Sequence, residues 1–476
     1  MLPLSALSAL LATTLSLELV DAHGAHGHAH VHRDVAQERR DAAAAPSGTG
    51  KYNIPPLSAI TSGLPAGATP TLSSTFSAGA KPTAYSNAPA LPAKFVFNAG
   101  DWPVLDQIPP TDSDQVKEWL KELDGVDIPD IRPTKDGSCD GDPEAAAQAQ
   151  QNGWWTCGSY TSGNDIVQCP EKNTWGVSFD DGPAPYCESK VLQYLSDHDL
   201  TATFFTVGSR VVSYPEILID EYMAGHEISV HTWSHPPLTS LTNEQLVAEF
   251  GWTRHAIQTV LGVTPTTMRP PYGDIDNRVR AVANAMGLRP IIWTTGSQGD
   301  FDTNDWRVPA GQHTGQEAFD VFEGILGQAA SMDHGFIVLE HDLFEIEVDL
   351  SVGYFLDAAL THNPPFKLES IGRCMNIALN NMYQETADAG SAGSNTTTTA
   401  AGSNTSKAPS STGSGGSKAP SSTGSSSSNP STSASTNSSG GSSSGSGNAA
   451  AGLLVPGSAV LGVVAAAVAA VFAGSL

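Results

Sequence analysis

The central part of the chain alternates short apolar runs with longer segments in which apolar residues recur at helical spacing. The runs are rich in β-branched and aromatic residues, which favour strands. They are Trp175–Phe179, Ala202–Val207, Glu227–His231, Thr266–Arg269, Pro290–Thr294, Phe336–Leu339 and Lys367–Glu369. Helices are predicted near 186–197, 214–224, 242–260, 276–286, 315–330 and 347–361.

Strands and helices alternate through residues 151–384, and this order predicts parallel strands joined by right-handed crossovers. The units fit an α/β fold, a distorted (β/α) barrel of about seven parallel strands. An open, doubly wound sheet is the structural alternative. In both folds the ligand site lies at the carboxyl ends of the strands.

The segments before this region differ in composition. Residues 1–22 form an apolar run that ends in small residues of the kind found at a cleavage site, which is typical of a secretory signal peptide. A buried helix is the alternative. Residues 23–93 begin with a His-rich tract, which either binds metal or is a solvated tail. They continue as an Ala/Pro/Ser-rich segment that we expect to be unstructured. Residues 94–150 are predicted to be an extension that packs on the domain formed by residues 151–384.

The segments after the central region predict a surface location. Residues 385–447 are rich in Ser, Thr and Gly and cannot bury a core, so we expect a disordered, glycosylated stalk. Sequons occur there at Asn395, Asn404 and Asn437. Residues 448–476 combine small residues, a spacer and an apolar tail, which is the order of a glycosylphosphatidylinositol (GPI) attachment signal. Asn448 is the expected attachment residue, with Gly445 to Gly447 as rivals, and a plain tail-anchored helix is the alternative.

The net charge and the predicted anchor indicate which kinds of partner the chain can bind. The 476 residues contain 23 Lys and Arg against 49 Asp and Glu, a net charge of −26. Such an acidic chain repels phosphate backbones, so we expect no nucleic-acid partner. A GPI anchor would make the membrane a partner and would place the chain at the plasma membrane, in the cell wall, or both. The five cysteines of a secreted chain allow two disulfides and one free thiol, but their spacing does not fix the pairing.

Polar clusters follow five of the predicted strands. Taken singly, each cluster has a structural explanation, such as a helix cap, a turn or a surface pair. Their convergence at one edge of a parallel sheet makes a functional site the better interpretation. The clusters are Ser178–Asp181, His231–His235, Arg269–Gly273, Asp302–Trp306 and Leu339–Asp342.

These residue types suit metal-assisted hydrolysis of an acyl group. Two imidazoles and one carboxylate make a three-ligand site for a divalent ion, with a position left open for water. A second carboxylate can take the proton of that water, and a histidine opposite can protonate the leaving group. Backbone N–H groups can hold the oxyanion that forms between the two steps.

The motifs Ser-Phe-Asp-Asp, His-x-x-x-His, Arg-Pro-Pro-Tyr, Asp-Trp and Val-Leu-Glu-His-Asp, in this order, resemble those of the polysaccharide deacetylases (carbohydrate esterase family four) over about residues 170–375. With the surface signals, the chain resembles the GPI-anchored chitin deacetylases of fungi. The resemblance implies hydrolysis of the N-acetyl groups of chitin to chitosan and acetate. The partners would be chitin, its oligosaccharides and other cell-wall polysaccharide. An O-acetyl polysaccharide esterase and an inert wall mannoprotein or chitin-binding protein are the alternatives.

The resemblance also implies a role for each matching residue. Asp180 would be the general base, oriented by Arg269, and His341 the general acid. Asp305 would adjust the pKa of His341, and Asp302 is the alternative candidate for that role.

The remaining implied roles concern the ion, the substrate and one disulfide. The ion would be zinc or cobalt, held by Asp181, His231 and His235. The backbone N–H of Tyr272 would stabilise the oxyanion of the substrate. The side chains of Trp306 and Leu339 would line the pocket for the acetyl methyl group. In the family pattern a cysteine before the first strand bridges one near the end of the domain, and Cys169 and Cys374 fit those places.

Overall fold

The computed structural model describes residues 49–63 and 76–387. The predicted signal peptide, the His-rich tract, the stalk from residue 388 with its sequons at Asn395, Asn404 and Asn437, and the anchor signal at Asn448 lie outside these residues. Residues 385–387, where the disordered stalk was expected to begin, are packed on the barrel: the backbone N–H of Thr264 donates to Glu385 Oε2 at 2.6 Å, and Thr386 is buried. Within the described ranges, no helix combines the length and the apolar character that crossing a membrane requires.

Seven parallel strands form the central sheet, in the order β5-β4-β3-β2-β1-β8, with β9 also paired to β1. Their positions agree with the apolar runs of the sequence to within a few residues. The strands are β1 (Thr174–Asp180), β2 (Thr203–Thr206), β3 (Glu227–Val230), β4 (Thr267–Met268), β5 (Arg289–Pro290), β8 (Phe336–Ile337) and β9 (Lys367–Ser370).

Hydrogen bonds between the outer strands curl this sheet toward closure. The backbone N–H of Thr294, just after β5, donates to the carbonyl of Ile337 in β8 at 3.0 Å. The predicted distorted barrel is therefore confirmed, and the open-sheet alternative is wrong. The sequence did not predict the small antiparallel hairpin of β6 (Thr295–Gly296) and β7 (Gly299–Asp300), whose strands are too short to leave a periodic pattern.

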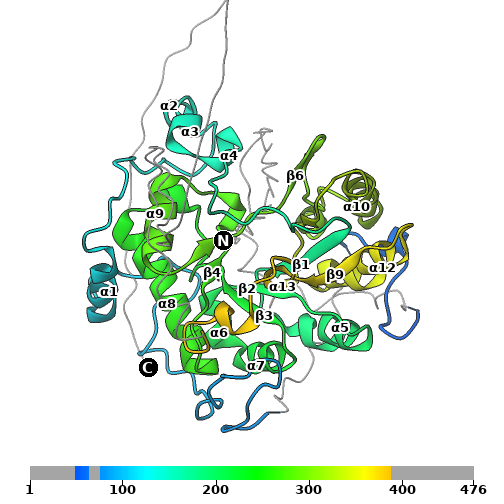
Figure 1. Cartoon of the computed structure of the whole chain (residues 1–476), viewed down its shortest axis with the longest axis horizontal. Coiled ribbons are helices and arrows are strands. Elements are labelled where there is room, and N and C mark those ends of the chain that lie inside the picture. The colour runs from blue at the N-terminus through cyan, green and yellow to red at the C-terminus, as the bar shows by residue number, and fades with distance from the viewer. Residues whose placement is uncertain (1–48, 64–75, 388–476) are drawn as a thin grey trace, which may run out of the picture. The chain divides into compact units, whose positions relative to one another are not determined.

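Helices connect the strands and lie around them (Figure 1). The longest of the described helices, α8, has Thr242 as its N-cap residue, and Thr242 and Gln245 form a capping box by exchanging side-chain-to-backbone hydrogen bonds. The helices of the barrel are α5 (Gln193–Asp197), α6 (Gly208–Ser213), α7 (Pro215–Met223), α8 (Asn243–Leu261), α9 (Asn277–Ala285), α10 (Gly315–Ala329), α11 (Glu345–Leu350), α12 (Leu356–Thr361) and α13 (Ile371–Cys374). Two π-helical segments, Cys187–Leu192 and Ser351–Phe355, precede α5 and α12.

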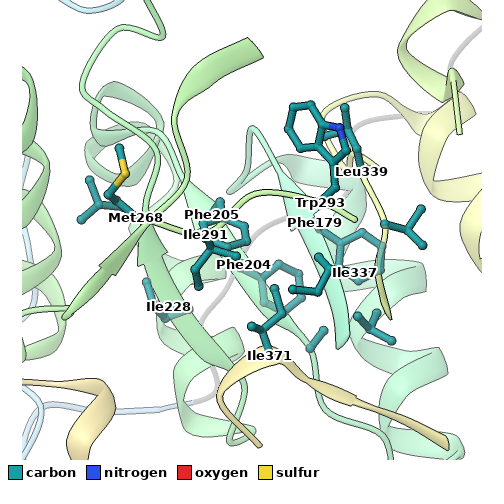
Figure 2. Packing of buried hydrophobic residues seen from close by; sticks show 14 of the residues in the cluster. Phe179, Phe204, Phe205, Ile228, Met268, Ile291, Trp293, Ile337, Leu339 and Ile371 are labelled. Atoms are coloured by element: carbon teal, nitrogen blue, oxygen red, sulfur yellow. The ribbon is translucent and has the colours of Figure 1, made fainter. Parts of the chain in front are cut away.

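The hydrophobic core lies on both faces of the strands. Every residue of β1, β2 and β3 is buried, as expected for a parallel sheet covered by helices on the outside and closed on the inside. Phe179 of β1 stacks on Phe204 of β2, and Figure 2 shows them packed with side chains from β3, β4 and β8. This packing fixes the strand ends on which the functional residues stand.

The expectation that residues 23–93 are unstructured is wrong for the part that the structure describes. Ile60 is fully buried, and Tyr85 stacks on Tyr222 of α7 while its hydroxyl donates to the carbonyl of His226 at 2.7 Å. An Ala/Pro/Ser-rich segment cannot build a core of its own. Its few large apolar residues are instead buried against the barrel.

Residues 94–150 run across the outside of α8 and α9. Helix α1 (Asp114–Trp119) is capped by Ser113 and presents Trp119 to α8, where it meets Trp252 edge to face at 5.4 Å. Three further one-turn helices follow: α2 (Pro143–Ala146), α3 (Ala149–Asn152) and α4 (Trp155–Gly158).

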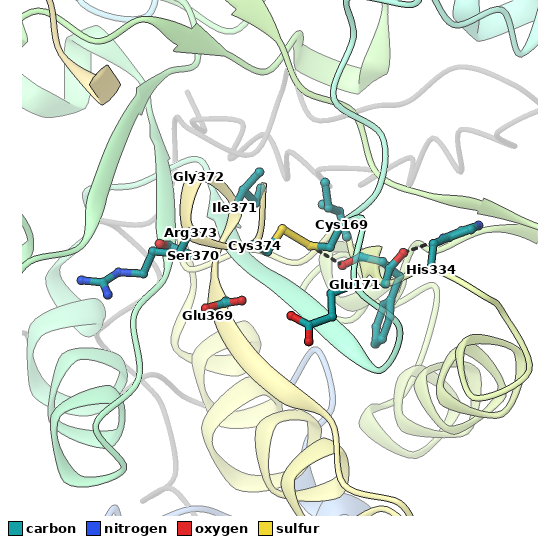
Figure 3. The surroundings of a disulfide bond; sticks show 12 residues. Cys169, Glu171, His334, Glu369, Ser370, Ile371, Gly372, Arg373 and Cys374 are labelled. Carbon is teal, nitrogen blue, oxygen red and sulfur yellow. Dashed lines mark hydrogen bonds between the residues drawn. A yellow bond between two sulfur atoms is a disulfide. The ribbon is translucent and has the colours of Figure 1, made fainter. Parts of the chain in front are cut away.

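Two disulfides hold the described chain. Cys169 and Cys374 are joined, as the family resemblance implied, and the bond ties the approach to β1 to the last helix, α13 (Figure 3). The second disulfide joins Cys139 and Cys157 in the extension. Cys187 is the remaining thiol and is buried.

Replacing Gly251 with alanine tests whether close packing holds the extension on α8. A Cβ atom at this position would lie 2.2 Å from Cε3 of Trp119, so the indole must move away. We expect the free energy of unfolding to fall by about 1–3 kcal/mol, the usual cost of overpacking. Chemical denaturation followed by tryptophan fluorescence measures the change.

Gly324 of α10 supplies the matched control. It is also a helical glycine, but a Cβ atom there meets nothing within 4 Å. Gly324→Ala should raise the free energy of unfolding by about 0.5–1 kcal/mol through helix propensity alone. Shifts of the same sign and size in both variants would contradict the packing described.

Candidate active site

The carboxyl ends of β1, β3 and β4 bring three of the predicted clusters together. Asp180 ends β1, His231 follows β3, and Arg269 follows β4. Asp181 and His235 have positive φ angles of 79° and 60°. Such backbone conformations are costly for residues other than glycine and concentrate at functional sites.

Asp181, His231 and His235 form the predicted three-residue group. Asp181 Oδ1 lies 3.1 Å from His235 Nε2 and 3.5 Å from His231 Nε2. His231 Nδ1 is 2.8 Å from the carbonyl of Arg269, which fixes the tautomer and leaves Nε2 as a lone-pair donor facing Asp181. Burial lowers the pKa of His231 well below its usual range, and the neighbouring His235 adds to this effect. A neutral imidazole is the form that binds a metal ion, so the donor set fits a zinc-type ion.

Asp180 is held apart from this group by Arg269. Arg269 Nη1 donates to Asp180 Oδ1 at 2.6 Å, and its guanidinium lies 4.0 Å from the ring centroid of Phe205. Asp180 Oδ2 is 3.9 Å from His231 Nε2. Burial raises the pKa of Asp180 by more than Arg269 lowers it. The carboxylate is therefore a better proton acceptor than an exposed aspartate.

His341 faces the group from the end of β8 and pairs with Asp305. His341 Nδ1 lies 2.8 Å from Asp305 Oδ1, and the backbone N–H of His341 donates to Asp305 Oδ2 at 2.7 Å. Burial lowers the pKa of His341, but the charge of Asp305 and its hydrogen bond raise the pKa well above the usual value. The competing Asp302 instead accepts from the backbone N–H of Asn304 and from Trp306 Nε1. The structure therefore brings Asp305, and not Asp302, to the imidazole.

Asp180, His231, His235 and His341 open into one pocket, whereas Asp181, Arg269 and Asp305 lie behind its lining. The lining includes the predicted side chains of Asp180, His231, His235, Tyr272, Trp306, Leu339 and His341. Sequence reasoning missed another set of lining residues, which come from α4, the end of β5 and the β6–β7 hairpin and carry no motif. These are Trp155, Thr156, Ser159, Trp293 and Asp300.

Comparisons with known proteins identify relatives among the polysaccharide deacetylases. The sequence model described as Polysaccharide deacetylase matches residues 167–291. Chitin deacetylase 1 of Cryptococcus neoformans var. grubii is 49% identical over 358 residues, 74% of this chain and 73% of that protein. The chitin deacetylase of Amylomyces rouxii is 37% identical over 268 residues, 52% of this chain and 61% of that protein. The solved chitin deacetylase of Colletotrichum lindemuthianum aligns with a TM-score of 0.41 and 24% identity, over 47% of this chain and 97% of that one.

The parallel barrel carries a pocket lined by carboxylates and histidines at the carboxyl ends of its strands, as expected of a hydrolase. With a relative at 49% identity matched over 73% of its length, the chain belongs to the polysaccharide deacetylase family. The family resemblance predicted from the five motifs is confirmed.

Replacing Asp181 with alanine tests the metal group. The change removes the only carboxylate of the group and leaves two imidazoles, so we expect the affinity of chelator-treated protein for zinc to fall at least about 100-fold. Calorimetric titration with zinc measures it. Asp302→Asn is the control, because Asp302 is not a member of the group; a similar loss in both variants would contradict the assignment.

Asp305→Asn tests the origin of the charge on His341. The amide removes the negative charge at Nδ1, while the burial that disfavours the imidazolium remains. We therefore expect the pKa of His341 to move from above its ordinary value to below it, as followed by NMR of the imidazole in metal-free protein. Asp302→Asn should shift it much less. An unchanged pKa in Asp305→Asn would show that another group holds the proton.

Proposed function

We propose that this chain hydrolyses the N-acetyl groups of chitin, the β-1,4-linked polymer of N-acetylglucosamine, to give chitosan and acetate. The observation that carries the proposal is that a paired carboxylate and a paired imidazole flank one ligand group in a single pocket. Relatives named chitin deacetylases support the choice of substrate.

The group that would hold the ion is Asp181, His231 and His235. When bound, a zinc or cobalt ion lowers the pKa of a water molecule and polarises the carbonyl of the acetyl group. The neutral imidazole of His231 is ready to bind without losing a proton.

Asp180 is the proposed general base. It accepts the proton of the attacking water, and its raised pKa brings it closer to the range in which a base is effective. Arg269 fixes the orientation of this carboxylate through the 2.6 Å hydrogen bond. Since Arg269 occupies Oδ1, the second oxygen, Oδ2, is the one that takes the proton.

His341 is the proposed general acid. Its raised pKa keeps a proton on the ring at neutral pH, and Asp305 holds Nδ1, so the proton at Nε2 goes to the nitrogen of the departing amine. The backbone N–H of Tyr272 stabilises the oxyanion, and Trp306 and Leu339 contact the methyl of the acetyl group.

The setting of the reaction is also a proposal. Cleavage of residues 1–22 would secrete the chain, and a GPI lipid at Asn448 would attach it to the plasma membrane or deliver it to the cell wall. The stalk at 385–447, glycosylated at Asn395, Asn404 and Asn437, would extend the catalytic domain toward wall chitin. At the cell surface, the catalytic domain would act on chitin chains that are already assembled in the wall.

Acetate release from chitin oligosaccharides tests the proposed activity. Release should stop on chelation and return with zinc or cobalt, because the attacking water needs the ion. Acetylated xylan is the comparison substrate. Faster release from xylan would favour the O-acetyl esterase, and no release from either substrate by metal-loaded protein would favour the inert wall protein.

Asp180→Asn tests the division of roles between the two adjacent aspartates. The amide keeps the shape of the side chain but cannot accept a proton, so we expect kcat to fall about 10³-fold. The affinity for zinc should stay within about threefold of the wild type, in contrast to Asp181→Ala. An active Asp180→Asn enzyme, or one that no longer binds zinc, would contradict the assigned role.

A further inference from the structure

A second group of potential ligands lies outside the pocket. Cys187, Glu221 and Asp342 come from the π-helical segment before α5, from α7 and from the loop after β8, and their ligand atoms lie within 4.8 Å of one another. Cys187 Sγ is 3.7 Å from Glu221 Oε1. None of the three has a role in the proposed deacetylation, and none lines the pocket.

Within the described part of the chain, three of the four carboxylate oxygens in this group lack hydrogen-bond partners, and the fourth, Glu221 Oε1, accepts only from Cys187 Sγ. Each of the three residues has an exposed fraction of 0%. Both oxygens of Asp342 and Oε2 of Glu221 have no hydrogen-bond partner within the described residues. Over the same residues, no ion pair with lysine, arginine or histidine reaches either carboxylate. Buried carboxylates with a single thiol donor between them and no ion-pair partner are costly, so this cluster requires either protons or a cation.

We propose that Cys187, Glu221 and Asp342 form a second divalent-cation site, of the zinc type. One thiolate and two carboxylates supply three ligand atoms from three separate segments. The sulfur donor favours zinc or cobalt over calcium or magnesium, which prefer oxygen ligands alone. Binding releases the thiol proton of Cys187, and any carboxyl proton, to solvent.

Such an ion would support the loop that carries the catalytic aspartates. The backbone N–H of Asp342 donates to the carbonyl of Asp180 at 3.3 Å. A Cβ atom on Gly182 would lie 2.9 Å from Asp342 Oδ1, so this carboxylate lies directly against the loop. An ion bound by Asp342 would therefore fix the backbone of Asp180 to Gly182 from behind. It would also offset part of the negative charge concentrated there.

The competing explanation is that the three groups simply hold protons. Burial raises the pKa of Cys187 and Glu221 well above their usual ranges and that of Asp342 to about 7. Without a bound ion, these groups therefore hold protons. The two explanations differ in metal content and in whether Cys187 is a thiolate.

Cobalt binding by the full chain carrying Asp181→Ala separates these explanations. This variant lacks the carboxylate of the pocket's ligand group, and the histidines that remain there or in the His-rich tract bind cobalt without a sulfur ligand. A sulfur-to-cobalt band therefore reports the second site alone. Cys187 is the one cysteine of the five outside the two disulfides. After folding in cobalt and dialysis, we expect a near-ultraviolet sulfur-to-cobalt charge-transfer band with the intensity of one thiolate-bound cobalt per chain. The absence of this band would overturn the proposal in favour of protons.

Two further measurements locate the ion. Cys187→Ala, added to Asp181→Ala, should abolish the band and lower the affinity for cobalt at least about tenfold; a band that persists would overturn the proposal. In the wild type, a chelator should remove the ion of the pocket quickly and the buried second ion only on unfolding. If the Cys187→Ala chain does not fold, the single Asp181→Ala variant and the wild type still decide the question.

Discussion

The buried ion pair between Arg269 and Asp180 is the interaction on which the site depends. Arg269 is fully buried and stands on the strand end after β4, whereas Asp180 ends β1, so the pair spans the inside of the barrel. Its 2.6 Å hydrogen bond and the ring of Phe205 offset the cost of removing both charges from water. Removing one partner would leave an uncompensated buried charge, which costs about 3–5 kcal/mol.

This pair also explains how two adjacent aspartates become suited to the different roles of the proposed mechanism. Asp180 completes its strand and is engaged by Arg269, whereas Asp181 turns at a positive φ angle and faces the two imidazoles. The environments shift the pKa values in opposite directions. Burial raises the pKa of Asp180, while for Asp181 the charges of His235 and Arg210 outweigh burial and hold the pKa well below its usual range. A raised pKa suits a base, and a lowered one suits a ligand.

Much of this arrangement could be predicted from the sequence, because strand ends of a parallel barrel meet at one edge. The five clusters contained the three potential ligands and both members of the Asp180–Arg269 and Asp305–His341 pairs, and the predicted strand boundaries were close. The sequence could not decide which of Asp302 and Asp305 pairs with His341, because both lie in an irregular loop. Only the folded structure shows that Asp305 lies next to His341.

The same limit applies wherever a contact links segments far apart in the chain. Trp155 reaches the pocket from a one-turn helix with no motif, and Ile60 is buried against a barrel that lies a hundred residues later in the sequence. The cluster of Cys187, Glu221 and Asp342 likewise joins residues up to 155 positions apart. Composition and periodicity describe local structure and carry no information on such pairings.

The most direct test of the account is an anomalous-difference map at the zinc absorption edge from crystals of the zinc-loaded protein. The account predicts a peak in the pocket whose ligands are Asp181, His231 Nε2 and His235 Nε2, with Asp180 bound to Arg269 and outside the coordination sphere. A zinc ion that takes Asp180 as a ligand, or that binds without Asp181, would contradict the division between base and ligand from which the proposed mechanism follows.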